Sequence, residues 1–210
     1  MKIKIDFKVF LLIFCYLITN KIRVFSVILF FILIHELAHI LSGIILGLKP
    51  KKINFTLAGF SIEFEEKIVK NYISKSKTRL KNKIIIDLSG PIVNLILSII
   101  FILLRNPDFT YANLLIFLVN IMPILPLDGG RVLKNILLYK YTFRTVNSVI
   151  VEISRINLII LTLIGSIIIV YLKNPLIAIF IIYLWAQFIK EKHYSNMIKN
   201  MYNIISKELL

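Results

Sequence analysis

The chain has 210 residues, a formal net charge of +15 and 58% hydrophobic residues. A soluble domain of this length has about 45–50% apolar residues, so the excess, gathered in long Ile, Leu and Phe runs, predicts an integral membrane protein. Lys and Arg lie between these runs and not along one polar face, which argues against a nucleic-acid partner. Cys15 is the single cysteine, so an internal disulfide and a cysteine-based metal site are excluded.

Six apolar runs predict an all-α polytopic membrane protein with about six transmembrane helices. The first run follows a charged front, as in a signal peptide, but no small-residue cleavage site follows it, so we expect it to remain as a first span. About 20 residues are needed to cross the hydrocarbon core, so the shorter runs could be re-entrant or interfacial instead. The runs are residues 5–20, 24–48, 84–104, 111–127, 156–172 and 175–189.

Six crossings place both termini on one side of the membrane. This topology places 22 of the 26 Lys and Arg residues on the same side as the termini. Because cytoplasmic loops carry the excess of Lys and Arg, we expect a multi-pass protein with both termini in the cytoplasm. On this division, residues 1–189 form the transmembrane domain. Residues 190–210 form a basic amphipathic tail at the cytoplasmic surface.

The loop after the second run is expected to contain two kinds of structure. Apolar and polar residues alternate from Phe60 onward, which predicts a short membrane-associated β-hairpin within residues 54–65. An irregular loop whose aromatic side chains rest on the lipid headgroups is the alternative. Residues 67–83 are rich in Lys, Ser and Asn and are expected to form a solvated connector that anionic lipid attracts.

The sequence His35-Glu36-Leu37-Ala38-His39 lies within the second apolar run. Histidines four residues apart lie on one face of a helix, so both imidazoles can bind one Zn²⁺ while Glu36 approaches the metal-bound water. Ionisable residues at mid-span are costly and usually face a functional cavity. The pattern therefore predicts a hydrolytic zinc site, with a purely structural hydrogen-bonded cluster as the alternative.

A catalytic zinc site takes a third protein ligand. His193 follows the last run in the basic tail, and Asp87 borders the Lys-rich loop, so both are poor candidates. Asp128 lies within residues 120–131, where two prolines and a Gly pair are expected to break the helix. Lipid tolerates such a break only where protein or water satisfies the freed backbone groups, so Asp128 is expected to face a polar cavity.

These motifs carry a resemblance to a known family. His-Glu-x-x-His inside an apolar run, followed by Asn-x-x-Pro-x-x-Pro-Leu-Asp-Gly-Gly at residues 120–130, resembles the site-2 protease family of intramembrane metalloproteases. Residues 120–131, the Gly59 region and Lys192-His193-Tyr194 together resemble its stage IV sporulation protein FB branch. Gly90-Pro91-x-x-Asn94 is similar to a further family motif, although the start of a helix explains Gly90-Pro91 equally well.

The resemblance implies that His35, His39 and Asp128 bind zinc. It also implies that Glu36 is the catalytic acid/base and that Asn120 lies near the substrate. The implied substrate is a membrane-associated protein, the precursor of a sporulation sigma factor, cleaved near the cytoplasmic face under the control of inhibitory membrane proteins. Longer members of this branch carry a nucleotide-sensing CBS domain, which we do not expect here.

In the expected mechanism, Zn²⁺ polarises the scissile carbonyl and Glu36 carries a proton from water to the leaving amine. A transmembrane substrate must unwind first, and the segment with Phe60 and Ile62 could hold it as an added edge strand. One alternative is a general site-2 protease acting on anti-sigma factors or signal-peptide remnants. Another is a zinc transporter or a catalytically silent zinc-binding protein, although a transporter would string ionisable residues through several spans.

Overall fold

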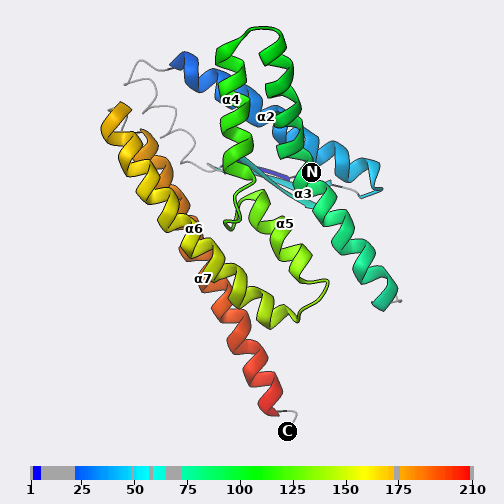
Figure 1. The fold of residues 1–210 in the computed structure, drawn as a ribbon. Coiled ribbons are helices and arrows are strands. Elements are labelled where there is room, and N and C mark those ends of the chain that lie inside the picture. Colours follow the sequence, from blue (N-terminus) through cyan, green and yellow to red (C-terminus); the bar gives the residue numbers. More distant parts are fainter. Residues whose placement is uncertain are drawn as a thin grey trace. The chain divides into compact units, whose positions relative to one another are not determined.

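The computed structural model describes residues 2–5, 22–48, 50–56, 59–64, 72–172 and 176–208. Most of these residues are helical, and three strands form one small sheet (Figure 1). By internal contacts the chain divides into two compact units, Met1–Ile121 and Met122–Leu210.

Three helices of the first unit pack against one another. Asn106 caps the third of them by accepting a hydrogen bond from Phe109 N, and Pro107 occupies the first turn, where its missing N–H costs no helical bond. Each of the three contacts the other two. They are α2 (Ile22–Ile45), α3 (Tyr72–Leu103) and α4 (Pro107–Asn120).

An aromatic cluster fills the space between these helices. Phe31 of α2, Phe101 of α3 and Phe109 of α4 contact one another edge to face, with ring centroids 5.1–5.6 Å apart. In lipid the hydrophobic effect does not drive helices together, so close packing of this kind supplies the attraction. Because Phe31 lies one turn before His35, the cluster fixes where α2 presents that imidazole.

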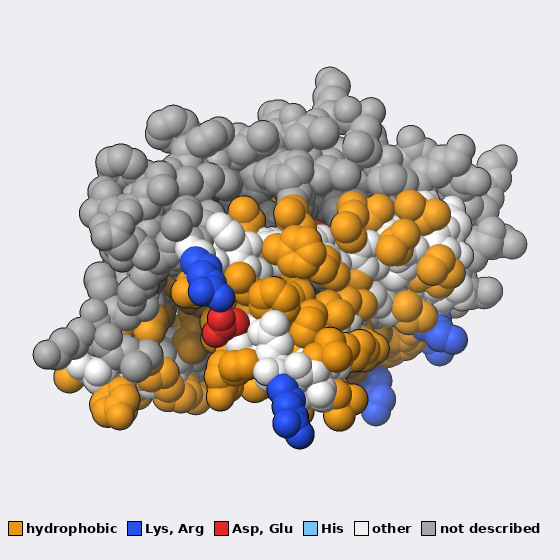
Figure 2. Space-filling model, turned by 90° about the horizontal axis from the view of Figure 1, so that it is seen from above, with side chains coloured by type: hydrophobic (Ala, Val, Ile, Leu, Met, Phe, Trp, Pro, Cys, Tyr) orange, Lys and Arg blue, Asp and Glu red, His pale blue; other side chains and the backbone are white. Residues whose placement is uncertain are grey.

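The burial of polar and apolar residues on α2 is the opposite of that on a surface helix of a soluble protein. His35, Glu36 and His39 are buried, while the other side exposes large apolar residues. Apolar side chains also cover most of the described surface on the face shown in Figure 2. Such a surface suits lipid as the solvent. The exposed residues on α2 lie at helical spacing and include Leu33, Leu37, Leu41 and Ile44.

The sheet has the strand order β1-β2-β3. β2 and β3 pair antiparallel, with Ile53 opposite Ile62 and Phe55 opposite Phe60, and β1 pairs parallel to β2. β2 therefore has a partner strand on both sides, whereas β3 is an edge strand among the described residues. The location of this hairpin at the membrane surface stays a prediction. The strands are β1 (Lys2–Ile5), β2 (Pro50–Thr56) and β3 (Gly59–Phe64).

In the second unit one long helix contacts both of the others. α6 packs against α5 and α7. Gly165 allows α6 and α7 to approach closely, because a Cβ there would overlap Ile181 Cδ1, and Trp185 Nε1 donates to Thr162 Oγ1 at 3.0 Å. The predicted tail from residue 190 continues α7 without a break as far as Glu208. The helices are α5 (Asp128–Leu137), α6 (Phe143–Leu172) and α7 (Leu176–Glu208).

Three helices among the described residues are long and apolar enough to cross a membrane, namely Ser26–Ile45, Lys77–Leu103 and Phe143–Tyr171. Three predicted runs fall on them, at residues 24–48, 84–104 and 156–172. The run at 175–189 lies mostly within α7, and the run at 5–20 lies outside the described residues except for Ile5 in β1. The count of six crossings stays a prediction.

The apolar run at residues 111–127 is not one continuous helix, in agreement with the break predicted within residues 120–131. α4 ends at Asn120, and an irregular segment follows until α5 begins at Asp128. The prolines stop the helix as expected, because they remove donors and clash with the preceding turn. The Gly pair does not, since it lies inside the first turn of α5.

Two polar segments are helical where the sequence predicted none. The connector predicted at residues 67–83 is helix from Tyr72 onward, and α6 begins at Phe143, well before residue 156. Lys and Arg have good helix propensity, and Glu152 pairs with Arg155 at 2.6 Å, one turn apart. Hydropathy located the apolar parts of these helices and missed their polar extensions.

Candidate metal centre

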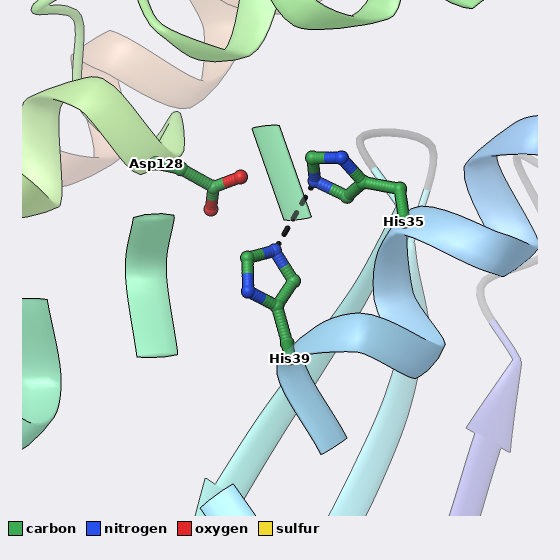
Figure 3. A group of neighbouring side chains, drawn as sticks. All are labelled: His35, His39 and Asp128. Atoms are coloured by element: carbon green, nitrogen blue, oxygen red, sulfur yellow. Dashed lines mark hydrogen bonds between the residues drawn. The ribbon is translucent and has the colours of Figure 1, made fainter. Parts of the chain in front are cut away.

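The two predicted histidine ligands lie one turn apart on the buried side of α2. Their Nε2 atoms face each other at 3.1 Å, as Figure 3 shows. His35 is 3% exposed, and both His39 and Glu36 are 7% exposed. The structure therefore brings together the three residues of α2 that the motif singles out.

Each Nδ1 atom has its own acceptor on α3. His35 Nδ1 lies 2.6 Å from Asn94 Oδ1, and His39 Nδ1 lies 2.6 Å from the carbonyl oxygen of Ile86. A carbonyl oxygen only accepts hydrogen bonds, so both Nδ1 atoms are donors. In an imidazole that carries a single proton, on Nδ1, the lone pair lies on Nε2.

This donor set fits a zinc ion. With both Nδ1 atoms donating elsewhere, two Nε2 atoms 3.1 Å apart share either a proton or a metal ion. Two nitrogen ligands of a tetrahedral zinc, each about 2.0–2.1 Å from the metal, lie about 3.3 Å apart, close to the observed separation. Metal-binding histidines also commonly donate their second ring N–H to a carbonyl, as both do here.

Gly90 of α3 keeps the space in front of the imidazoles open. A Cβ at this position would lie 2.5 Å from His39 Nε2 and 2.7 Å from His35 Nε2, so any side chain there would force the imidazoles to move. Gly90 and Pro91 lie inside α3, so the alternative that they begin a helix is wrong. Gly90 and Asn94 were left out of the predicted site, although the Gly-Pro-x-x-Asn motif was the signal that could have included them.

Two serines form a second polar contact between α2 and α3, next to His39. Ser42 Oγ donates to the carbonyl oxygen of His39 at 2.9 Å, and Ser89 Oγ donates to that of Ile86 at 2.7 Å. The two hydroxyls lie 3.0 Å apart, and Ser89 Oγ is 3.3 Å from His39 Nδ1. No motif marks these serines, so their role emerges only from the packing of the helices.

Asp128 is the first residue of α5, in the second unit, and is 6% exposed. Its side chain is labelled in Figure 3. Its Oδ1 lies 3.9 Å from Arg131 Nη1, one turn further along α5. A carboxylate in the first turn of a helix interacts favourably with the helix dipole.

The irregular segment before α5 is closely packed. Leu125 N donates to Ser154 Oγ of α6 at 3.0 Å, and Ile124 is fully buried. A Cβ at Gly130 would lie 2.6 Å from the carbonyl carbon and oxygen of Ile124. Gly130 is therefore explained by the close approach of this backbone to α5, which fixes the start of the helix and with it Asp128.

The three residues predicted to bind the substrate lie on α4 and β3, which carry none of the predicted metal ligands. Asn120 is the last residue of α4, and its Nδ2 donates to the carbonyl oxygen of Ile116 at 3.0 Å. Phe60 and Ile62 lie on β3, where their backbone is described and their side chains are not. Their roles in substrate binding stay predictions.

Comparison with known proteins shows similarity to a sporulation protein in sequence and to a site-2 protease in fold. No protein-family model matches the chain. An alignment of 126 residues, 56% of the chain, is 28% identical to Stage IV sporulation protein FB of Bacillus subtilis (strain 168), and the chain spans about two fifths (41%) of that relative's length. The site-2 protease from Methanocaldococcus jannaschii has a similar fold, with a TM-score of 0.65, 19% identity and 90% of both chains covered. Both findings agree with the predicted resemblance.

Proposed function

We propose that this chain, whose sequence and fold support a place in the site-2 protease family, is an intramembrane zinc metalloendopeptidase. The observation that carries the proposal is the pair of buried imidazoles on α2 whose Nε2 atoms lie 3.1 Å apart, with the buried Glu36 between them in sequence. Ionisable groups inside an apolar helix are costly and usually mark a functional site. A site-2 protease fold supports the same assignment.

We assign the zinc ion to His35, His39 and Asp128. Each offers one ligand atom, an imidazole nitrogen or a carboxylate oxygen, and all three side chains are buried. Two histidines and one acid leave one position of a four-coordinate zinc open, as catalytic sites require. When bound, the ion would supply a Lewis acid that polarises a peptide carbonyl and favours the ionisation of water.

Glu36 is assigned the proton transfers. It follows His35 directly on α2, and its side chain is buried as that of His35 is, which supports a place at the same site. It accepts a proton from the attacking water as the new C–O bond forms. It then delivers this proton to the amide nitrogen as the C–N bond breaks, so that the product leaves as a neutral amine.

The substrate must be extended before it can be cut. The amides of a membrane helix are already hydrogen-bonded, so a transmembrane substrate has to unwind. In the described part of the chain β3 is an edge strand, and it carries Phe60 and Ile62; this supports binding of the unwound peptide as an added strand. We place Asn120, at the end of α4, beside the same peptide; turnover unchanged by Asn120→Leu would remove it from the site.

Similarity to a sporulation protein supports a membrane-associated precursor as the substrate, and we propose the pro-form of a sporulation sigma factor. Cleavage would occur near the cytoplasmic face of a multi-pass protein with cytoplasmic termini, whose partners are lipid and inhibitory membrane proteins. The reconstituted chain can be offered this pro-form beside an anti-sigma factor and a signal-peptide remnant. Cleavage of the latter two alone would assign a general site-2 protease instead.

Zinc dependence tests the proposed activity. The purified chain, reconstituted in lipid, is expected to cleave a transmembrane substrate, to lose this activity when a chelator removes the metal and to regain it on addition of Zn²⁺. Product masses measured by mass spectrometry identify the bond that is cut. Cleavage that persists after zinc has been removed, as checked by elemental analysis, would rule out a zinc protease.

A further inference from the structure

We propose that Asn113 of α4 is a positioning residue for the metal site: it fixes the amide of Asn94, and Asn94 in turn fixes the tautomer of His35. The inference rests on the metal site of the proposed function and is independent of the identity of the substrate. It assigns a role in metal binding to α4, a helix that contributes no metal ligand.

The three side chains form a relay across three helices. Asn113 Nδ2 donates to the carbonyl oxygen of Phe109 at 2.8 Å, Asn94 Nδ2 donates to Asn113 Oδ1 at 2.9 Å, and Asn94 Oδ1 lies 2.6 Å from His35 Nδ1. The side chains of Asn94 and Asn113 are both fully buried. The relay thus joins a backbone carbonyl of α4 to an imidazole of α2.

The direction of the relay follows from its last acceptor. The backbone carbonyl of Phe109 cannot donate, so the Asn113 amide must point its nitrogen there and its oxygen toward Asn94. This oxygen can only accept, so Asn94 points its nitrogen to Asn113 and its oxygen to His35. His35 Nδ1 must therefore donate, which leaves the Nε2 lone pair for a metal.

Without Asn113 this direction is lost. The amide of Asn94 can turn over and present an N–H to His35 Nδ1, which must then accept. The imidazole proton moves to Nε2 in that tautomer, and the nitrogen that should bind the metal becomes a donor. Mutation of an outer-shell partner of this kind typically lowers metal affinity by roughly 10–100-fold.

The anchor of the relay is itself held in place. Phe109, whose carbonyl oxygen is the last acceptor, contacts Phe31 of α2 edge to face with ring centroids 5.3 Å apart. Phe31 lies one turn before His35. Both ends of the relay are therefore fixed to the same segment of α2, so that α4 cannot shift its acceptor relative to the imidazole without disturbing the aromatic cluster.

The test measures metal binding by the purified full chain, with Co²⁺ in place of zinc. Affinity is obtained by competition with Zn²⁺, and the d–d absorption spectrum reports the ligand geometry. Asn113→Leu replaces the amide with an apolar side chain of similar size, so that both of its hydrogen bonds are lost. It is expected to weaken Co²⁺ binding roughly 10–100-fold. Asn113→Asp keeps an acceptor for Asn94 in either protonation state and is expected to restore most of the affinity and the wild-type spectrum.

A double variant tests whether Asn113 acts through Asn94. Residues that work in one chain of hydrogen bonds are not additive. Asn94→Leu combined with Asn113→Leu is therefore expected to bind Co²⁺ no more weakly than Asn94→Leu alone. Additive losses would show that Asn113 acts by another route and would overturn the relay.

Thr110→Val is the matched control on the same helix. Thr110 is also buried, and its Oγ1 donates to the carbonyl oxygen of Asn106 at 2.8 Å, so this change removes a buried hydrogen bond of α4 outside the relay. It is expected to bind Co²⁺ as the wild type does. Equal losses in Thr110→Val and Asn113→Leu, or none in Asn113→Leu, would overturn the relay alone. A wild-type chain that binds no Co²⁺ would overturn the proposed metal site as well.

Discussion

Glu36→Gln is expected to slow substrate cleavage by about 10²–10⁴-fold while the chain keeps its fold and its zinc. Gln has nearly the same size as Glu and can occupy the same buried position beside His35. Its amide cannot take up a proton at neutral pH, so the proton of the attacking water has no acceptor and the leaving nitrogen has no donor. Single-turnover cleavage in lipid measures the rate, and elemental analysis of the same sample measures the bound zinc.

Glu152→Gln provides the matched control. Glu152 lies exposed on α6 in an ion pair with Arg155, so the same change of atoms and charge occurs outside the candidate site. It is expected to cleave at the wild-type rate. Turnover by Glu36→Gln within a few-fold of wild type, with Glu152→Gln unaffected, would show that Glu36 transfers no proton in the reaction.

Asp128→Asn is expected to weaken zinc binding by more than about 100-fold, because loss of a ligand should exceed the 10–100-fold that the loss of an outer-shell partner costs. Asn keeps the size of the side chain but offers a neutral oxygen to a divalent cation. Cleavage should be lost together with the metal and return in part at high zinc concentration. Competition with a chelator of known zinc affinity measures the change.

The control for this change is Asp108→Asn. Asp108 lies in the first turn of α4, as Asp128 does in α5, and is exposed in an ion pair with Arg23 at 3.6 Å. Both changes remove a carboxylate from a helix N-terminus, so both lose the same interaction with the helix dipole. Only Asp128→Asn should lose zinc. Equal zinc affinities for the two variants would mean that the third ligand lies elsewhere.

The histidine pair could be predicted from the sequence because it depends on local geometry alone. Any helix places residues four positions apart on one face, so His35 and His39 lie together whatever surrounds them. Glu36 lies within the same motif and could be predicted together with the two histidines. The apolar runs also located the three helices that, in the described part of the chain, are long and apolar enough to span a membrane, because lipid demands a continuous apolar surface.

The surroundings of the histidines could not be predicted, because they depend on how separate helices pack. Asn94 and Asn113 are far apart in sequence, and only the contact between α3 and α4 joins their amides. The glycines illustrate the same limit. Gly130 was expected to help break a helix, but it lies inside α5, where the lack of a Cβ admits the backbone of Ile124.

The central claim is that two imidazoles and one carboxylate hold a single Zn²⁺. X-ray absorption at the zinc edge of the loaded protein tests this most directly, because it reports the kind and distance of the ligand atoms. We expect two imidazole nitrogens and an oxygen shell, all at about 2.0–2.1 Å. A sulfur ligand at about 2.3 Å, or a shell without imidazole, would contradict the proposed site.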